Sequence, residues 1–431
     1  MAFIQALSGL YGAATGLDVI GNNLANASTV GYKNSRAEFS DIFNSYLKAG
    51  VGGGALSPGV AQQFTQGSLA STNNGLDFSI NGNGMFQVVS DTTATASVAY
   101  TRNGEFHFSP VPTAAGTAPA EKYIVNANGS YLTGWAEGVA TTTAPSALKL
   151  IDSIAAKQTT TSNLRFNLDD RASVPTDPVF SPNSPASFNW SSSQEVFSGV
   201  NGDTKAHALT LYFVKTATPN TWEVHTRIDG AVPAEEAGGP RQLVFSPTGS
   251  LLSGGNITSS GPVTAESKAT DPVTGAVTLT SSTVTLPISI DFGQTTLFAS
   301  GFDSGKSLQD GYKDGLLAGT SLSTDGTIQG RYSNGQTQNM GKVALATFIN
   351  PNGLQSIGSN LWRETSHSGA ANIGSAAQGG RGVTASNSLE QANIDTAAQL
   401  VDMITMQRNY QANAQTIKTQ DDMLKTLTGL R

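Results

Sequence analysis

Helical periodicity is confined to the two ends of this 431-residue chain, and this distribution restricts the fold more than any other feature. Near the N-terminus, apolar residues recur every three or four positions, at Phe3, Leu7, Leu10, Ala14, Leu17 and Leu24. This spacing is that of a heptad seam. Asp18 is the only charged residue between positions 3 and 24. The pattern predicts an N-terminal helix that packs along one apolar stripe.

The same segment is rich in glycine, which is unusual for a helix. Gly9, Gly12, Gly16 and Gly21 each cost an isolated helix up to ~1 kcal/mol relative to alanine. Glycine suits a helix where another backbone comes close. We therefore predict a helix that is weak alone and stable when packed.

A second helical pattern lies at the C-terminus. Ser388-Leu389-Glu390-Gln391 matches a capping box, which predicts a helix from there to about Leu427, with Gly429 at C′. The polar seam positions Asn413 and Gln420 are of the kind that fixes register. The apolar seam consists of Met403, Met406, Tyr410, Ile417, Leu424 and Leu427, and a second stripe of Ile394, Val401 and Ile404. Two stripes predict more than one helical neighbour.

Between the ends, strand alternation replaces the helical period. Apolar residues alternate over 207–214 and, after a Pro219-Asn220 turn, over 222–228, which predicts a β-hairpin with one solvated face. Similar alternation occurs at 284–291 and 343–349. The predicted fold class is mainly β with a terminal α-helical coiled coil. If the terminal helices pair, the chain leaves and returns through every domain, and the domains are nested.

Composition and motifs argue against several functions. A formal net charge of −7, with 24 scattered Lys and Arg, disfavours nucleic-acid binding, and the chain contains no cysteine for disulfides or thiolate metal sites. The first basic residue is Lys33 and no run of about 18 apolar residues occurs, so we expect neither a Sec signal peptide nor membrane insertion.

We also expect no catalytic, cofactor or metal site. Gly301–Ser307 resembles a P-loop, but three residues separate its glycines where a P-loop has four. The adjacent acidic pairs Asp169-Asp170 and Glu235-Glu236 lie in predicted loops, and because neighbouring residues point apart on a strand, we expect solvated charges there and no working acid/base pair. None of the four histidines has metal-ligand spacing, and His107 and His225 are predicted to be exposed on outward strand faces.

An apolar helix stripe usually belongs to the core of its own domain. Here both stripes sit at chain ends flanked by Gly-rich segments such as Lys48–Gly59, so we predict that the terminal helices associate with other copies.

Four blocks of sequence resemble the bacterial flagellar rod and hook proteins. "LANASTVGYK" (Leu24–Lys33) is similar to the signature of that family, matching at Ala25, Asn26, Thr29, Gly31, Tyr32 and Lys33. Residues 75–88, 100–106 and 401–427 resemble the later blocks in the same order. Length and the middle segments 207–226 and 325–354 resemble the hook-type members more than the shorter rod proteins.

The resemblance implies a specific domain organisation. The implied domains are a helical D0 (1–28 and 386–431), linkers (29–70 and 367–385), a β-rich D1 (71–145 and 287–366) and an inserted β domain D2 (146–286). Residues 34–70 and 366–387, including Gly52-Gly53-Gly54, are expected to supply compliance. Asn22–Ser35 is the predicted joint, with Tyr32 and Lys33 starting a surface no longer buried among helices. Whether Tyr32 packs on its own chain or on a neighbour stays open.

The implied function is that of a structural, non-enzymatic subunit of the flagellar hook. It would polymerise into a curved, flexible, extracellular tube that transmits torque from rod to filament. The implied partners are further copies, the distal rod, the hook cap, the hook–filament junction proteins and the type III export apparatus. Two alternatives remain: another axial subunit such as a distal rod protein, or a secreted β-rich adhesin or enzyme oligomerised by its terminal helices.

Overall fold

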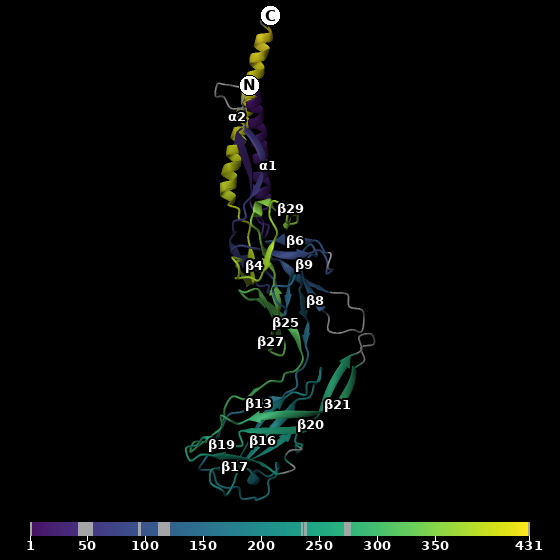
Figure 1. The fold of residues 1–431 in the computed structure, drawn as a ribbon, viewed down its shortest axis with the longest axis vertical. Helices are drawn as coiled ribbons and strands as arrows, with labels where there is room; N and C mark the ends of the chain where they lie inside the picture. Colours follow the sequence, from purple (N-terminus) through teal and green to yellow (C-terminus); the bar gives the residue numbers. More distant parts are fainter. Residues whose placement is uncertain are drawn as a thin grey trace. The chain divides into compact units, whose positions relative to one another are not determined.

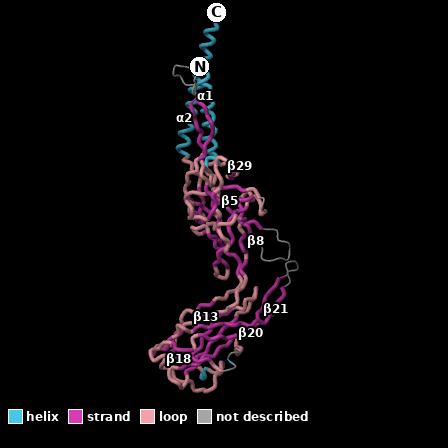
Figure 2. Tube along the Cα trace, in the orientation of Figure 1, coloured by secondary structure: helices cyan, strands magenta, loops and turns pink. Residues whose placement is uncertain are grey.

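The computed structural model describes residues 2–41, 55–93, 96–110, 121–233, 236, 239–270 and 277–429. It is mainly β, and its two long helices come from the two ends of the chain, as predicted (Figures 1 and 2). The chain divides into two compact units. Unit 1 comprises residues 1–152, 318–331 and 337–431, and unit 2 comprises residues 153–317 and 332–336.

Unit 1 contains both helices and most of the short strands. Its elements are α1 (Ala2–Ala25), β1 (Ser35–Asp41), β2 (Ala55–Gln62), β3 (Leu69–Ser71), β4 (Phe78–Asn81), β5 (Met85–Val89), β6 (Val98–Thr101), β7 (Phe106–Pro110), β8 (Glu121–Asn126), β9 (Tyr131–Ala136), β10 (Ser146–Ala147), β11 (Lys149–Ile151), β26 (Thr327–Tyr332), β27 (Thr337–Val343), β28 (Leu345–Thr347), β29 (Gln355–Gly358), β30 (Leu361–Arg363), β31 (Asn372–Gly374), β32 (Val383–Ser386), β33 (Ser388–Glu390) and α2 (Thr396–Gly429). A further strand, β25 (Gly315–Leu322), crosses from unit 2 into unit 1.

Helices α1 and α2 pack side by side in antiparallel directions (Figure 1). A Cβ added at Gly9 would lie 2.8 Å from Asn413 Nδ2, and one at Gly16 would lie 3.2 Å from Met406 Sδ. These glycines therefore do allow a close approach, but to the partner helix of the same chain. Gly12 makes room for the ring of Phe39 in β1, because a Cβ at Gly12 would lie 3.3 Å from Phe39 Cε1.

The most buried stripe of α1 consists of small or slender residues. Ala6, Ala13 and Ile20 recur every seven positions and are buried, together with Asn23. The leucines of the predicted seam flank this stripe and are half-buried. Small residues lie innermost because the β1–β2 hairpin and α2 both pack on this helix.

The predicted capping box is wrong. Ser388, Leu389 and Glu390 form strand β33, which pairs with β3, and α2 begins only at Thr396. Asp395 caps it, because its Oδ1 accepts hydrogen bonds from the N–H groups of Ala397 and Ala398 at 3.0 and 3.2 Å. The spacing of Ser388 and Gln391 suits a helix cap locally, but pairing of this segment with β3 places it in a strand instead.

Much of the sequence expected to form linkers is strand. Residues 35–41 and 55–62 form the antiparallel β1–β2 hairpin, with a register shift between Glu38 and Ser40. In the returning segment, β31 pairs with β28 and β32 pairs with β4. The Gly52-Gly53-Gly54 run lies outside the described residues. The C-terminal strands β32 and β33 thus return to pair with the N-terminal strands β4 and β3.

The main sheet of unit 1 includes strands in the order β26-β27-β9-β5-β6-β30-β29. Its apolar residues gather around Met85, Tyr100 and Trp362. Phe106 makes ring contacts with both Phe78 and Phe86, with centroids 5.7 and 5.6 Å apart. This packing holds the strands that precede and follow the terminal segments.

Unit 2 packs two main sheets around one core, which contains Phe166, Phe213, Trp222 and Phe292. Its elements are β12 (Ser153–Ile154), β13 (Thr161–Asn163), β14 (Phe166–Asp169), β15 (Trp190–Val196), β16 (His207–Lys215), β17 (Thr221–Ile228), β18 (Arg241–Phe245), β19 (Leu251–Ser253), β20 (Asn256–Thr270), β21 (Val277–Asp291), β22 (Thr296–Phe298), β23 (Asp303–Ser304) and β24 (Leu308–Gln309). One sheet has the order β15-β16-β17-β18-β19 and the other β20-β21-β13-β24.

The hairpin predicted from alternation is confirmed as β16–β17, in which Phe213 pairs with Val224. The predicted solvated face is wrong for β17, because every residue of that strand except Glu223 is buried. The predicted boundary between residues 286 and 287, by contrast, falls inside the uninterrupted strand β21. Strands β21 to β24 all belong to unit 2, because β21 pairs with β13 and β22 pairs with β14.

His107 is exposed, as predicted, but the prediction for His225 is wrong. His225 is buried because the ring of Phe180 stacks on it, with centroids 3.8 Å apart, and its Nδ1 lies 2.7 Å from Glu236 Oε1. His207 is buried between two carboxylates, with Nε2 3.0 Å from Asp203 and Nδ1 2.6 Å from Asp229. The alternation of residues along a strand shows which side chains share a face, but it does not show whether a loop covers that face.

Candidate functional site

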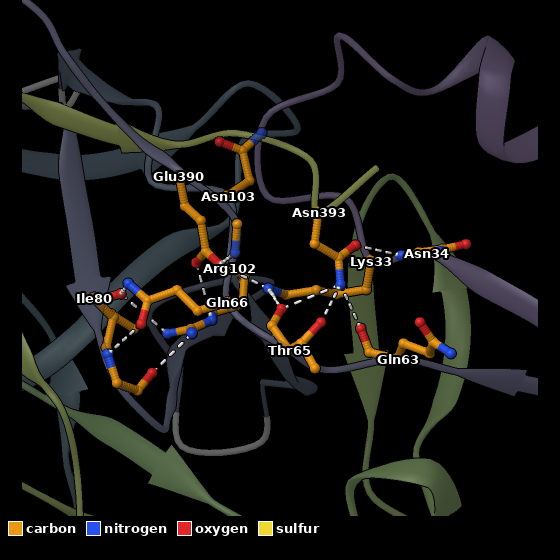
Figure 3. Close-up of polar contacts among 12 residues, drawn as sticks. Lys33, Asn34, Gln63, Thr65, Gln66, Ile80, Arg102, Asn103, Glu390 and Asn393 are labelled. Carbon is orange, nitrogen blue, oxygen red and sulfur yellow. Dashed lines mark hydrogen bonds and ion pairs between the residues drawn. The ribbon is translucent and has the colours of Figure 1, made fainter. Parts of the chain in front are cut away.

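The two terminal segments meet in a polar cluster between the helices and the β part of unit 1 (Figure 3). We call this cluster the terminal clasp and define it as Asn23, Lys33, Arg102, Glu390 and Asn393. Its members come from the end of α1, the segment after it, the turn after β6, strand β33 and the segment before α2. In the described part of unit 1, the chain passes between the helices and the strands through residues 26–34 and 391–395. The clasp includes residues from both of these segments.

Glu390 is the hub of the clasp. Its Oε1 lies 2.7 Å from Lys33 Nζ and accepts a hydrogen bond from the N–H of Gly67 at 2.9 Å. Its Oε2 lies 3.1 Å from Arg102 Nε as an ion pair. Its backbone carbonyl accepts a hydrogen bond from the N–H of Gly31 at 2.8 Å. A single residue near the C-terminus thus holds three segments from the N-terminal quarter of the chain.

All three charges of this cluster are out of contact with water. The side chains of Lys33 and Glu390 are each 1% exposed, and that of Arg102 is 5% exposed. Burial lowers the pKa of Lys33, and the Glu390 carboxylate opposes that shift. Burial lowers the pKa of Arg102 as well, again opposed by Glu390. The carboxylate is the counter-ion on which both buried cations depend.

The two cations also bind backbone carbonyls. Lys33 Nζ donates to the carbonyl of Thr65 at 2.8 Å, and Arg102 Nη2 donates to the carbonyl of Gly82 at 2.8 Å. Each of these side chains is therefore attached to the protein twice, through its own backbone and through the hydrogen bond from its charged group to a carbonyl of another segment. The cluster orders backbone rather than presenting reactive groups to a substrate.

Asn393 fastens the segment before α2. Its Oδ1 accepts a hydrogen bond from the N–H of Asn34 at 2.7 Å, and its Nδ2 donates to the carbonyl of Gln63 at 2.8 Å and to Thr65 Oγ1 at 2.9 Å. The Asn393 side chain therefore bridges the residue before β1 and the residues after β2 (Figure 3).

Asn23 plays the matching part at the end of α1. It is 1% exposed, its Oδ1 accepts from the N–H of Ser35 at 2.9 Å, and its Nδ2 donates to the carbonyl of Ser35 at 2.7 Å. The same amide nitrogen donates to Gln399 Oε1 in α2 at 3.1 Å. The Tyr32 hydroxyl donates to Asn22 Oδ1 at 2.8 Å, so Tyr32 bonds to its own chain.

Gly31 fits the clasp only because it lacks a side chain. Its φ is +69°, and a Cβ there would lie 2.5 Å from the backbone nitrogen of Asn103. Any other residue would combine left-handed backbone strain with a backbone clash. Gly31 thus lets the segment after α1 pass directly over the turn that carries Arg102.

The remaining signature residues shape the turn itself. Asn26 Nδ2 donates to the carbonyl of Asn22 at 2.9 Å, and Thr29 Oγ1 donates to Asn26 Oδ1 at 3.1 Å. These bonds satisfy groups where the α1 ladder ends. Ala25 is exposed, and nothing in the structure explains its place in the signature. Lys33, expected on a surface, is buried.

Sequence reasoning missed Arg102, Glu390 and Asn393, yet one signal was present. Charged residues make up only 13% of the chain, and Glu390 is the only charge between Arg381 and Asp395. An isolated charge in so weakly charged a segment indicates a specific partner.

The residues predicted to mediate assembly fall into two groups. Leu7, Leu10, Leu17, Leu24, Met403, Met406 and Ile417 are half-buried, whereas Phe3, Tyr410 and Leu424 are exposed. Leu427 lies in α2, but its side chain is outside the described part. By length and hydropathy Phe3–Ala25 could also cross a membrane, but in this structure the helix packs on α2 and the β1–β2 hairpin.

Comparison with known proteins defines the class of this chain. Family models match at residues 5–33 (flagella basal body rod protein), 167–312 (flagellar basal body protein FlaE D2 domain) and 385–430 (flagellar basal body rod FlgEFG protein C-terminal). The two terminal matches contain most of α1, all of α2 and all of the terminal clasp except Arg102. These matches place the chain among the flagellar basal body rod and hook proteins.

Full-length relatives narrow this class. The chain is 39% identical to the flagellar hook protein FlgE of Escherichia coli over 100% of both chains. It is 38% identical to that of Salmonella typhimurium over 100% of both, and 31% identical to that of Borreliella burgdorferi over 99% and 98%. The chain belongs to the flagellar hook protein family. The crystal structure of Helicobacter pylori flagellar hook protein FlgE2 aligns with 75% of this chain and 100% of its own, at a TM-score of 0.46 and 13% identity.

Proposed function

We propose that this structural subunit of the hook polymerises through the exposed faces of its terminal helices into a curved, flexible tube that carries torque from rod to filament. The observation that supports the proposal is the apolar surface of those helices. The exposed large apolar residues of α1 and α2 are Phe3, Ile4, Tyr11, Leu400, Val401, Ile404, Tyr410, Met423 and Leu424. Apolar side chains on both helices stay in contact with water in a single copy, and contact with further copies would bury them.

In this proposal the terminal clasp is the mechanical connection. Torque applied to the helices reaches the sheets through residues 26–34 and 391–395, and the clasp ties these two connections to each other. A buried charge cluster suits this role because pulling out one partner leaves uncompensated charge in the interior. Compliance then lies elsewhere, in contacts between copies or in segments outside the clasp.

The wider context rests on the family. We propose that the other partners are the distal rod, the hook cap, the hook–filament junction proteins and the type III export apparatus, which the chain would use without a Sec signal peptide. We also propose that the role is non-catalytic, and that D0, D1, D2 and linker boundaries follow the predicted scheme with D2 extended to include β21 to β24. The full-length relatives, all hook proteins, favour the hook over a distal rod role.

The test compares polymerisation of matched single variants. Ile404→Glu places a charge on the exposed face of α2, and we expect it to abolish tube formation on salting out while circular dichroism of the monomer stays unchanged. Ile349→Glu alters an equally aliphatic and more exposed residue outside the helices, and we expect tubes to form. Electron microscopy reads both outcomes. Tubes from Ile404→Glu, or catalytic turnover by the purified wild type, would overturn the proposal.

A further inference from the structure

The antiparallel pairing of the helices leaves one end of α2 beyond α1. Gly9 lies against Asn413, Gly16 against Met406, and Asn23 bonds to Gln399. Continuing this register places Ala2, the first described residue of α1, near Gln420. The following residues, 421–429, extend about 13 Å further at the rise of an α-helix. Figure 1 shows α2 continuing past the start of α1. We call residues 421–429 the α2 overhang.

The α2 overhang has an apolar side and a charged side. Met423 and Leu424 are 56% and 58% exposed. Asp421 pairs with Lys425 one turn later, at 2.5 Å, while Asp422 is exposed. A helix end with two exposed apolar side chains is stabilised by a neighbour that removes them from water.

Near the opposite end of the same helix pair lies an open groove of about 540 Å³. We call it the helix groove; its lining includes Gly16, Val19, Ile20, Phe39, Asp402 and Met406. The apolar floor is formed by α1 and β1. Arg36 also lines the groove and is exposed, which gives it a positive group at the surface. Asn34 Oδ1 lies in the lining, buried and without a hydrogen-bond partner in the described part of the chain.

We propose that the α2 overhang of one copy docks in the helix groove of a second copy. This inference rests on the proposed function, because it assigns the contact that would propagate the polymer. Met423 would cover the apolar floor, and Leu424 and Asp422, which lie on either side of Met423 around the helix, would lie at the two rims, where Asp422 would pair with Arg36.

The overhang cannot fill the groove of its own chain. Leu424 is 18 positions along α2 from Met406, which lines the groove, and this corresponds to about 27 Å of straight helix. An overhang that fills the groove must therefore come from another copy. The two surfaces are different and lie toward opposite ends of the helix pair, so the contact is head-to-tail, and head-to-tail contacts continue into an open filament or tube.

Disulfide trapping tests the contact, and the chain is suited to it because it contains no cysteine. Polymers of the full-length Leu424→Cys/Val19→Cys double variant are formed by salting out, oxidised and separated without reductant. We expect a ladder of dimers, trimers and larger species, because each copy carries one half of two different contacts. The control pairs Leu424→Cys with Tyr11→Cys, an exposed residue of α1 outside the groove lining, and should remain at least about tenfold less cross-linked.

Three outcomes would overturn the docking contact: polymers that do not cross-link, cross-linked species that stop at dimers, and a ladder equally strong in the Tyr11→Cys control. If wild-type protein forms no polymer under any condition, the proposed function fails instead. A charge exchange gives an independent reading that needs no cysteine. Asp422→Arg should raise the critical concentration for polymerisation about tenfold, and adding Arg36→Asp should restore it. Failure of that restoration contradicts the contact.

Discussion

Lys33 and Glu390 are 357 positions apart in the chain and form an ion pair of 2.7 Å in which both side chains are 1% exposed. The pair fixes the beginning of the chain to its end in the interior of unit 1. The Glu390 carboxylate also pairs with a third buried charge, Arg102, so the effect of substituting each of the three residues can be predicted.

Removal of the carboxylate should cost more stability than removal of one cation. Glu390→Gln leaves Lys33 and Arg102 buried together without a counter-ion, and we expect unit 1 to lose about 3–5 kcal/mol or more. Lys33→Met leaves Glu390 paired with Arg102 and should cost less. Urea unfolding followed by hydrogen exchange of the strands β3 and β33 measures both.

A matched surface pair provides the control. Lys425 and Asp421 are exposed and lie 2.5 Å apart, so Lys425→Ala should leave the free energy of unfolding nearly unchanged. Equal effects of Glu390→Gln and Lys425→Ala would contradict the role assigned to the clasp.

Two glycine-to-alanine substitutions should have opposite signs. Gly31→Ala introduces strain at a φ of +69° and a contact of 2.5 Å with backbone, and we expect a loss of about 2 kcal/mol or more. Gly21→Ala adds a methyl group that meets nothing within 4 Å in a helix, so it should stabilise α1 by up to about 1 kcal/mol. Thermal unfolding of both variants decides the matter, and a stabilising Gly31→Ala would refute the backbone argument.

The start of α2 can be tested by comparing two possible caps. Asp395→Ala removes the acceptor of two helix N–H groups and should cost about 1 kcal/mol, with faster amide exchange in the first turn of α2. Ser388→Ala should leave exchange in that turn unchanged, because Ser388 lies in β33 and its hydroxyl contacts Ser79. The reverse result would support the capping box that the sequence suggests.

Unit 2 should depend on pH through Asp310. Burial alone would raise the pKa of this carboxyl, but hydrogen bonds from Thr161 and Thr160, together with Lys157, hold it well below its usual range. A folded-state pKa below the unfolded one gives stability that is present above about pH 4 and is lost as the pH falls toward the folded value.

We therefore expect Asp310→Asn to destabilise unit 2 by about 1.5–3 kcal/mol at pH 7 and much less near pH 2. Hydrogen exchange in β13, which adjoins Asp310, reports the change. Asp303→Asn alters an exposed carboxylate of the same unit and serves as the control. A difference between wild type and Asp310→Asn that stays constant from pH 2 to 7 would rule out this linkage.

The sequence predicted the fold class well because periodicity is a local signal. The helices at both ends, the β character between them and the β16–β17 hairpin all follow from spacing alone. Only the N-terminal residues of the site were predicted. Asn26, Thr29, Gly31, Tyr32 and Lys33 were identified, whereas their partners come from residues about 70 and 360 positions away.

The errors share one physical cause, which is tertiary contact that local patterns do not encode. Ser388–Gln391 has the chemistry of a helix cap, but Glu390 is drawn into strand pairing and a buried ion pair. His225 occupies an outward strand position, yet Phe180 covers it. The Gly-, Ser- and Ala-rich stretch 366–387 resembles a linker, but its strands β31 and β32 pair with β28 and β4.

Unit 2 begins and ends on neighbouring strands, since Ser153 and Ile154 of β12 pair with Leu316 and Gly315 of β25. An inserted domain whose first and last strands are neighbours can be lengthened, shortened or exchanged while the rest of the chain keeps its fold. The length and sequence of this unit can therefore change without any change to the residues that close unit 1.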